Sequence, residues 1–160
     1  RLSKRLIKSP GFNYRLPEIP ALLGLEQLKQ IKHIIAEKTA LAEYYTNLLD
    51  GIPFLTCPKS ASYSRHTFQT YAVLLKNPKD RDRIISLLKS ENIEAGVYNY
   101  VIHRQPYYKD KYNLKDKDFP NSLYVSSRIL VLPLSQGLEK AQVKRIAKKI
   151  RSFFHVDNKG

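Results

Sequence analysis

The stretch GFNYRLPEIPALLGLEQLK, residues 11–29, carries the chain from a polar cluster into a long helical pattern. Apolar side chains recur at intervals of three and four residues as far as Leu49, which predicts one amphipathic helix over residues 17–49. Pro17 and Pro20 fit only its first turn, where backbone N–H groups have no partner within the helix. Such a helix is roughly twice as long as a small sheet can cover, so we expect its first half to lie against something outside this chain.

The rest of the chain alternates between strand and helix patterns. β-Forming residues predict strands over residues 66–75, 93–100 and 129–134, and apolar periodicity predicts helices over residues 80–90 and 139–154. The charged, proline-containing segment between the last two strands is expected to be mostly loop. Short helical stretches within it are compatible with residues 107–112 and 123–129. This order predicts an α+β fold, with a small antiparallel or mixed sheet that has helices on one face.

The formal net charge is +14, and the excess is concentrated towards the two ends of the chain. Such an excess favours an anionic partner, but it equally fits a solvated face or a docking surface for other parts of the protein. DNA binding is disfavoured, because the last predicted helix offers mainly lysine rather than a set of base-reading side chains. Its basic residues are Lys140, Lys144, Arg145, Lys148, Lys149 and Arg151.

No complete active site is visible in the sequence. It has no glycine-rich phosphate loop and no histidine or cysteine at metal-ligand spacing, so we expect no metal site. The lone Cys57 cannot form an internal disulfide, which favours a reducing, cytoplasmic setting. No apolar run approaches the roughly 20 residues that span a bilayer, so no membrane partner is expected. The chain contains no methionine, and we expect it to be a piece of a longer protein.

Two short polar clusters could contact a ligand. Asn13 and Arg15 stand directly before the long helix, a position that suits phosphate, although an ordinary asparagine turn and a surface arginine explain them equally well. His103 lies in VIHRQPYY, residues 101–108, beside the end of a predicted strand. Binding groups concentrate in such loops, so His103 is either a ligand contact or part of an ordinary polar loop.

Seven segments, taken in order, resemble the C-terminal part of the DegT/DnrJ/StrS family of pyridoxal-phosphate-dependent sugar aminotransferases. They are GFNYRLPEIPALLGLEQL, IIAEKTALAEYYTNLL, HTFQTYAVLL, RDRIISLLKSENIEAGV, IHRQPYY, DFPNS and SSRILVLPLSQGL. The resemblance implies the long linking helix and small C-terminal domain of a type I aminotransferase fold. It divides the chain into the end of a large cofactor domain, the linking helix, the small domain and a tail. These parts are residues 1–16, 17–50, 51–156 and 157–160.

The resemblance also implies an activity. Family members transfer an amino group, usually from glutamate, to a keto-sugar linked to a nucleotide, in the biosynthesis of amino sugars and of lipopolysaccharide or other polysaccharides. They are homodimers that use pyridoxal phosphate. The family's Schiff-base lysine and the aspartate that pairs with the pyridine nitrogen lie upstream of the matched segments, so we expect no catalytic residue here and no activity from this chain alone. The alternatives are a non-catalytic or dehydratase-type relative, or an independent basic module that binds nucleic acid or protein.

The resemblance assigns roles to five residues. Asn13 matches the asparagine that reaches the cofactor phosphate of the neighbouring subunit, and Arg15 is the next candidate for that phosphate or for the substrate diphosphate. His103 matches a histidine near the sugar-nucleotide pocket. The chain reads GVYNYVIHRQPYY where many members read GVHYPPLHLQPYY, so Tyr98 replaces the first family histidine and Arg104 replaces an apolar residue. We assign Tyr98 and Arg104 to substrate binding as well, with Arg104 either contacting a phosphate or facing solvent.

Overall fold

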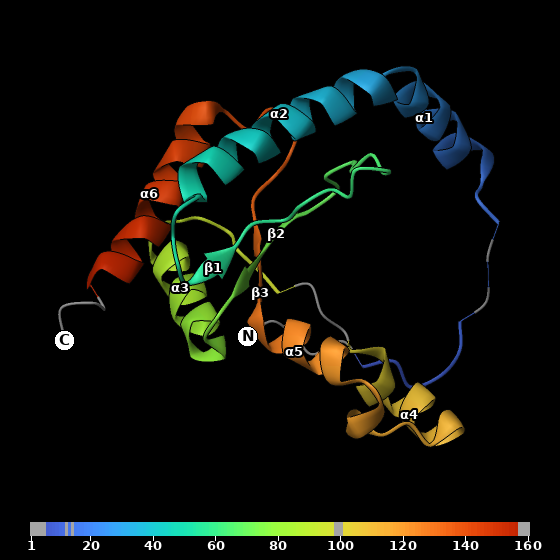
Figure 1. The fold of residues 1–160 in the computed structure, drawn as a ribbon. Coiled ribbons are helices and arrows are strands. Elements are labelled where there is room, and N and C mark those ends of the chain that lie inside the picture. The colour runs from blue at the N-terminus through green and yellow to red at the C-terminus, as the bar shows by residue number, and fades with distance from the viewer. Residues whose placement is uncertain (1–5, 12, 14, 98–100, 157–160) are drawn as a thin grey trace.

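The computed structural model describes residues 6–11, 13, 15–97 and 101–156. It confirms the α+β fold, a three-stranded antiparallel sheet in the order β1-β2-β3 with helices packed against it (Figure 1). In chain order the elements are α1 (Glu18–Lys29), α2 (Ile31–Leu49), β1 (Leu55–Thr56), β2 (Tyr71–Leu75), α3 (Pro78–Ser90), the 3₁₀ turn η1 (Ile102–Arg104), α4 (Pro106–Tyr112), the 3₁₀ turn η2 (Asp116–Asp118), α5 (Pro120–Arg128), β3 (Ile129–Leu132) and α6 (Lys140–Val156).

The long helix predicted over residues 17–49 is present but is interrupted at Gln30, whose ψ of 0° departs from helical geometry. Its two parts, α1 and α2, form the arm across the top of Figure 1. No residue of α1 is buried, whereas the last turns of α2 place Leu41, Ala42, Tyr45 and Leu49 in the core. Within the described chain, therefore, the first half of the arm is uncovered, as the excess length predicted.

The sheet differs from the sequence prediction at its edges. The strand predicted over residues 66–75 begins only at Tyr71, and the short strand β1 beside it was not predicted. The strand predicted over residues 93–100 is wrong for its described part, where a single bridge joins Gly96 to Val131. Glycine weakens a strand interior because it offers no side chain to pack, and this explains why pairing stops at a bridge.

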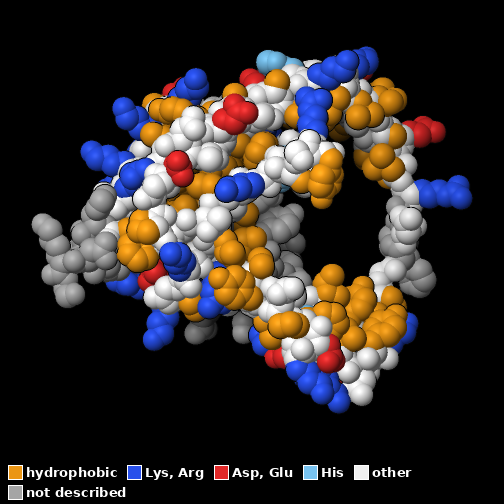
Figure 2. Space-filling view, in the orientation of Figure 1, with side chains coloured by type: hydrophobic (Ala, Val, Ile, Leu, Met, Phe, Trp, Pro, Cys, Tyr) orange, Lys and Arg blue, Asp and Glu red, His pale blue; other side chains and the backbone are white. Residues whose placement is uncertain are grey.

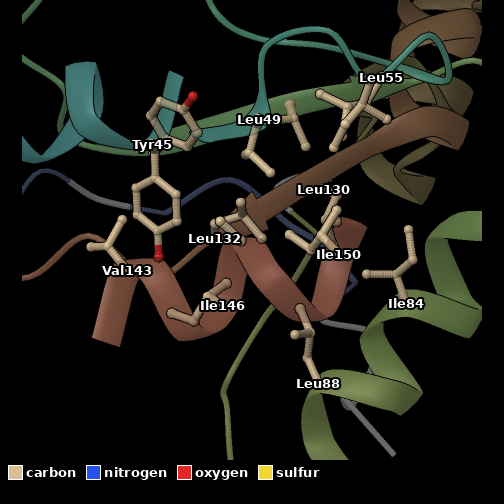
Figure 3. Packing of buried hydrophobic residues seen from close by; sticks show 14 of the residues in the cluster. Tyr45, Leu49, Leu55, Ile84, Leu88, Leu130, Leu132, Val143, Ile146 and Ile150 are labelled. Atoms are coloured by element: carbon tan, nitrogen blue, oxygen red, sulfur yellow. The ribbon is translucent and has the colours of Figure 1, made fainter. Parts of the chain in front are cut away.

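The core lies between one face of the sheet and three helices (Figure 3). Alternate residues of β2 and β3 are buried, as expected for a sheet with one covered face. The buried cluster combines these strand residues with side chains from α2, α3 and α6. At its centre the rings of Tyr45 and Tyr71 stack with 4.9 Å between centroids. The prediction of helices on one face is thereby confirmed.

The basic helix α6 is tied to its neighbours by several of its cations. Glu91, at the end of α3, accepts hydrogen bonds from Lys149 at 2.6 Å and from Arg145 at 3.3 Å. The Arg151 guanidinium donates to the backbone carbonyls of Leu48 and Asp50, where α2 ends. Cations suit the carbonyl-rich end of a helix, so these side chains have a structural use. None of the helices in the described chain is long and apolar enough to cross a membrane.

Candidate functional site

His103 lies on η1 and is only 4% exposed. Its ring stacks on Phe119, with 4.5 Å between centroids and 12° between planes. The Nε2 atom is buried without a hydrogen-bond partner in the described chain, although Asp116 Oδ1 lies 3.3 Å away. A buried polar atom with no partner is uncommon, and it marks this imidazole as a group able to accept or donate one more bond.

Arg104 and Asp116 form a two-pronged ion pair beside His103. Arg104 Nε donates to Asp116 Oδ1 at 2.9 Å, and Nη2 donates to Oδ2 at 2.7 Å. This fork geometry is the strongest form of an arginine–carboxylate contact. The Arg104 guanidinium, and secondarily His103, hold the pKa of Asp116 below its usual value, and the carboxylate in turn raises the pKa of Arg104. The arginine expected to meet a phosphate or solvent is therefore held by an internal carboxylate.

Two hollows meet at His103. The larger, about 1100 Å³, has a mainly apolar lining that includes Val101, Phe119 and Ile129. The smaller, about 520 Å³, is bounded by His103, Arg104, Lys109, Leu114, Lys115 and Asp116. Apolar volume beside a few polar groups is the usual character of a small-molecule site.

Gln105 connects this region to the N-terminal segment. The side chain is buried, and its Oε1 accepts a hydrogen bond from the Ile7 N–H at 2.9 Å. Ile7 O in turn accepts from the Tyr107 N–H at 3.1 Å, in the first turn of α4. Ile7 is thus anchored to the start of α4, and it lines the larger hollow.

The other predicted site residues do not join this cluster. Asn13 and Arg15 are exposed and have no hydrogen-bond or ion-pair partner among the described residues. Both residues precede α1, which begins at Glu18. Tyr98 lies outside the described residues. The structure brings together His103 and Arg104 alone from the predicted set.

Three members of the cluster were not predicted as site residues from the sequence, namely Gln105, Asp116 and Phe119. Gln105 stands in QPYY and Phe119 in DFPNS, so both were inside matched segments without being given a role. Asp116 lies in a run of alternating lysines and aspartates, where no local pattern separates a pairing carboxylate from a solvated one. No group of three potential metal ligands occurs in the described part of the chain.

Comparison with known proteins identifies the family to which the chain belongs. Residues 2–151 match the model of the DegT/DnrJ/EryC1/StrS aminotransferase family. A UDP-4-amino-4-deoxy-L-arabinose–oxoglutarate aminotransferase of Shewanella sediminis is 32% identical over 149 residues, which cover 88% of this chain and 38% of that protein. The spore coat polysaccharide biosynthesis protein SpsC of Bacillus subtilis is 30% identical over 151 residues, which cover 92% of this chain and 39% of SpsC.

A solved structure shows the same fold. Helicobacter pylori PseC, an aminotransferase involved in the biosynthesis of pseudoaminic acid, superposes with a TM-score of 0.79 at 23% identity. The superposition covers 94% of this chain and 40% of PseC. The chain thus spans about two fifths of the length of these relatives. With a family match that extends over most of its residues, the chain belongs to the DegT/DnrJ/EryC1/StrS aminotransferase family.

Proposed function

We propose that the protein containing this chain transfers an amino group, from glutamate as donor, to a keto-sugar carried on a nucleotide. The observation that carries the proposal is the family match over residues 2–151. The Shewanella relative is described as acting on a UDP-linked amino sugar, and SpsC as belonging to polysaccharide biosynthesis, which supports a nucleotide-sugar substrate and a role in polysaccharide biosynthesis. The working form is a cytoplasmic homodimer that uses pyridoxal phosphate.

The residues of this chain fit only one end of that cofactor. The Asn13 amide and the Arg15 guanidinium are exposed and unpaired within the described chain, so both are available to a phosphate group. No lysine here stands in the family's Schiff-base context. Pyridoxal phosphate supplies the aldehyde that accepts and passes on the amino group. The contribution of this chain is to hold the phosphate through Asn13 and Arg15 and to orient the sugar nucleotide near His103 and Arg104, with Tyr98 as a further contact.

The uncovered arm is evidence that a further, cofactor-bearing part of the protein packs against this chain. Figure 2 shows hydrophobic side chains gathered over α1 on the face that it displays. The exposed apolar residues of this arm are Leu16, Ile19, Leu22, Leu23, Leu25, Leu28 and Ile31. An apolar surface of this extent marks an interaction site rather than a solvated helix. We infer that the large domain packs here, with residues 17–50 as the linking helix.

The test compares the chain alone with the same chain joined to the large domain of the full protein. We expect the chain alone to show no amino transfer from glutamate to a UDP-linked 4-keto-sugar, and the full protein to show it. Transfer by the isolated chain would refute the assignment of catalysis to the upstream part. A full protein that has the lysine and the cofactor, but transfers no amino group to any keto-sugar nucleotide, would favour the non-catalytic alternative.

A substitution tests the phosphate role. In the full protein, Asn13→Ala should weaken cofactor retention by about tenfold, the value of one hydrogen bond to a charged group. Asn47→Ala, on the exposed side of α2, is the matched control and should leave retention unchanged. Equal retention of the cofactor by the two variants would refute the assignment of Asn13 to the cofactor site.

A further inference from the structure

The smaller hollow at His103 carries an unbalanced set of charges. Its boundary includes the cations Arg104, Lys109 and Lys115 but a single carboxylate, that of Asp116. Both oxygens of this carboxylate are engaged by Arg104, and neither lysine has an ion-pair partner within the described residues. A concave site lined by excess positive charge concentrates anions.

The Asp116 carboxylate is the anion that Arg104 contacts within the described residues. It receives both prongs of the Arg104 guanidinium and lies 3.3 Å from the buried His103 Nε2, which has no hydrogen-bond partner within the described residues. Carboxylate and phosphate oxygens both match the guanidinium fork. Asp116 is half-exposed and lies on the short turn η2, so solvent and ions reach its carboxylate.

We propose that the hollow between His103, Arg104, Lys109 and Lys115 binds a phosphate or diphosphate group, which takes over Arg104 and His103 from the Asp116 carboxylate. The ligand class rests on the proposed function in so far as a nucleotide sugar carries a diphosphate. Asp116 then acts as an internal counter-ion that competes with the ligand. The adjoining apolar hollow gives room for the rest of the molecule.

The experiment titrates the chain with inorganic pyrophosphate, in the absence of cofactor, by calorimetry and by the ring ¹H–¹⁵N NMR signals of histidine. His103→Gln identifies the signal of this residue. Asp116→Asn retains the shape of the side chain but removes the competing charge, so pyrophosphate should bind about tenfold more tightly. Lys115→Gln should weaken binding by about fivefold, and Lys148→Gln on α6 is its charge-matched control.

Tighter binding by Asp116→Asn, together with a pyrophosphate-dependent shift of the His103 signal, would establish the site. Equal losses in Lys115→Gln and Lys148→Gln would reduce the effect to general attraction by a cationic protein and overturn the proposal. Unchanged or weaker binding by Asp116→Asn would also overturn it. Should Asp116→Asn fail to fold, the comparison of Lys115→Gln with Lys148→Gln remains: a larger loss of binding in Lys115→Gln supports the site, and equal losses overturn it.

Two further ligands separate the possible sources of the phosphate. UDP supplies a nucleoside diphosphate, whereas pyridoxine 5′-phosphate supplies the phosphate monoester of a cofactor without its reactive aldehyde. Stronger binding of UDP assigns the hollow to the substrate, and stronger binding of pyridoxine 5′-phosphate assigns it to the cofactor. Because no amino transfer is measured, the proposed activity can fail while this site is established, and the reverse outcome is equally distinguishable.

Discussion

Removing the hydroxyl of Tyr45 should stabilise the fold. The residue is fully buried and its Oη has no hydrogen-bond partner in the described chain, while burial raises the pKa of the phenol well above its usual value. Burying an unpaired hydroxyl costs about 1–3 kcal/mol. Tyr45→Phe deletes that oxygen but keeps the ring stacked on Tyr71. After a small loss for the void left by the oxygen, we expect the free energy of unfolding to rise by about 1 kcal/mol.

Tyr71→Phe is the matched control because its hydroxyl is paired. Tyr71 Oη lies 2.9 Å from Thr46 Oγ1, and its deletion should lower the free energy of unfolding by about 1 kcal/mol. Urea titrations followed by circular dichroism measure both changes, and each corresponds to a shift of about 3 °C in Tm. A loss of stability in Tyr45→Phe as large as that in Tyr71→Phe would show that the Tyr45 hydroxyl is satisfied, and would refute the reasoning.

Three further substitutions test other parts of the fold. Arg151→Gln removes the guanidinium from the last carbonyls of α2 and should cost about 2 kcal/mol in urea unfolding, whereas Lys148→Gln on the same helix should cost nothing measurable. Lys149 foremost holds the pKa of Glu91 below its usual value, so the contribution of this carboxylate to stability is present above the ordinary glutamate pKa and is lost as the pH falls through the lowered pKa of the folded state. Glu91→Gln should therefore reduce the loss of stability at acid pH, measured as the urea midpoint against pH. Leu25→Gln on the uncovered α1 should change stability by less than about 0.5 kcal/mol and reduce self-association in sedimentation, and a large loss of stability would show that α1 is covered.

The helices were predictable from the sequence because each buries one continuous stripe. Three- and four-residue spacing located α2 and α6 closely, and the pattern placed α3 within two residues of its observed start at Pro78. The sheet was less predictable, since a two-residue strand such as β1 has no periodicity to read. Gly96 stood in an apolar run that looked like a strand, but only its backbone bridge to Val131 forms. Strand pairing depends on a partner elsewhere in the chain, which local patterns do not specify.

The candidate site, like the fold, was predictable from the sequence only in part. His103 and Arg104 could be singled out because polar and aromatic residues crowd one short motif next to a strand pattern. The environment of these two residues could not be predicted, because it is formed by Asp116 on η2 and by Phe119 at the start of α5. An ion pair between residues twelve positions apart, with α4 between them, leaves no periodic signal. The division of the chain at residues 16, 50 and 156 and the roles of Asn13, Arg15 and Tyr98 stay predictions.

The net charge of +14 has a different meaning once the cations are placed. On α6, the helix with the densest basic run, Arg145 and Lys149 bind Glu91, and Arg151 closes the end of α2. These side chains hold helices together, so the basic run is weaker support for a nucleic-acid partner than its composition suggested. Within the described residues, Lys109 and Lys115 have no carboxylate partner, and both border the hollow beside His103, where a concave boundary and a buried imidazole accompany them. Charge joined to shape and an unsatisfied donor or acceptor is a more specific indication of a ligand than charge alone, and it favours a small phosphorylated molecule over an extended polyanion.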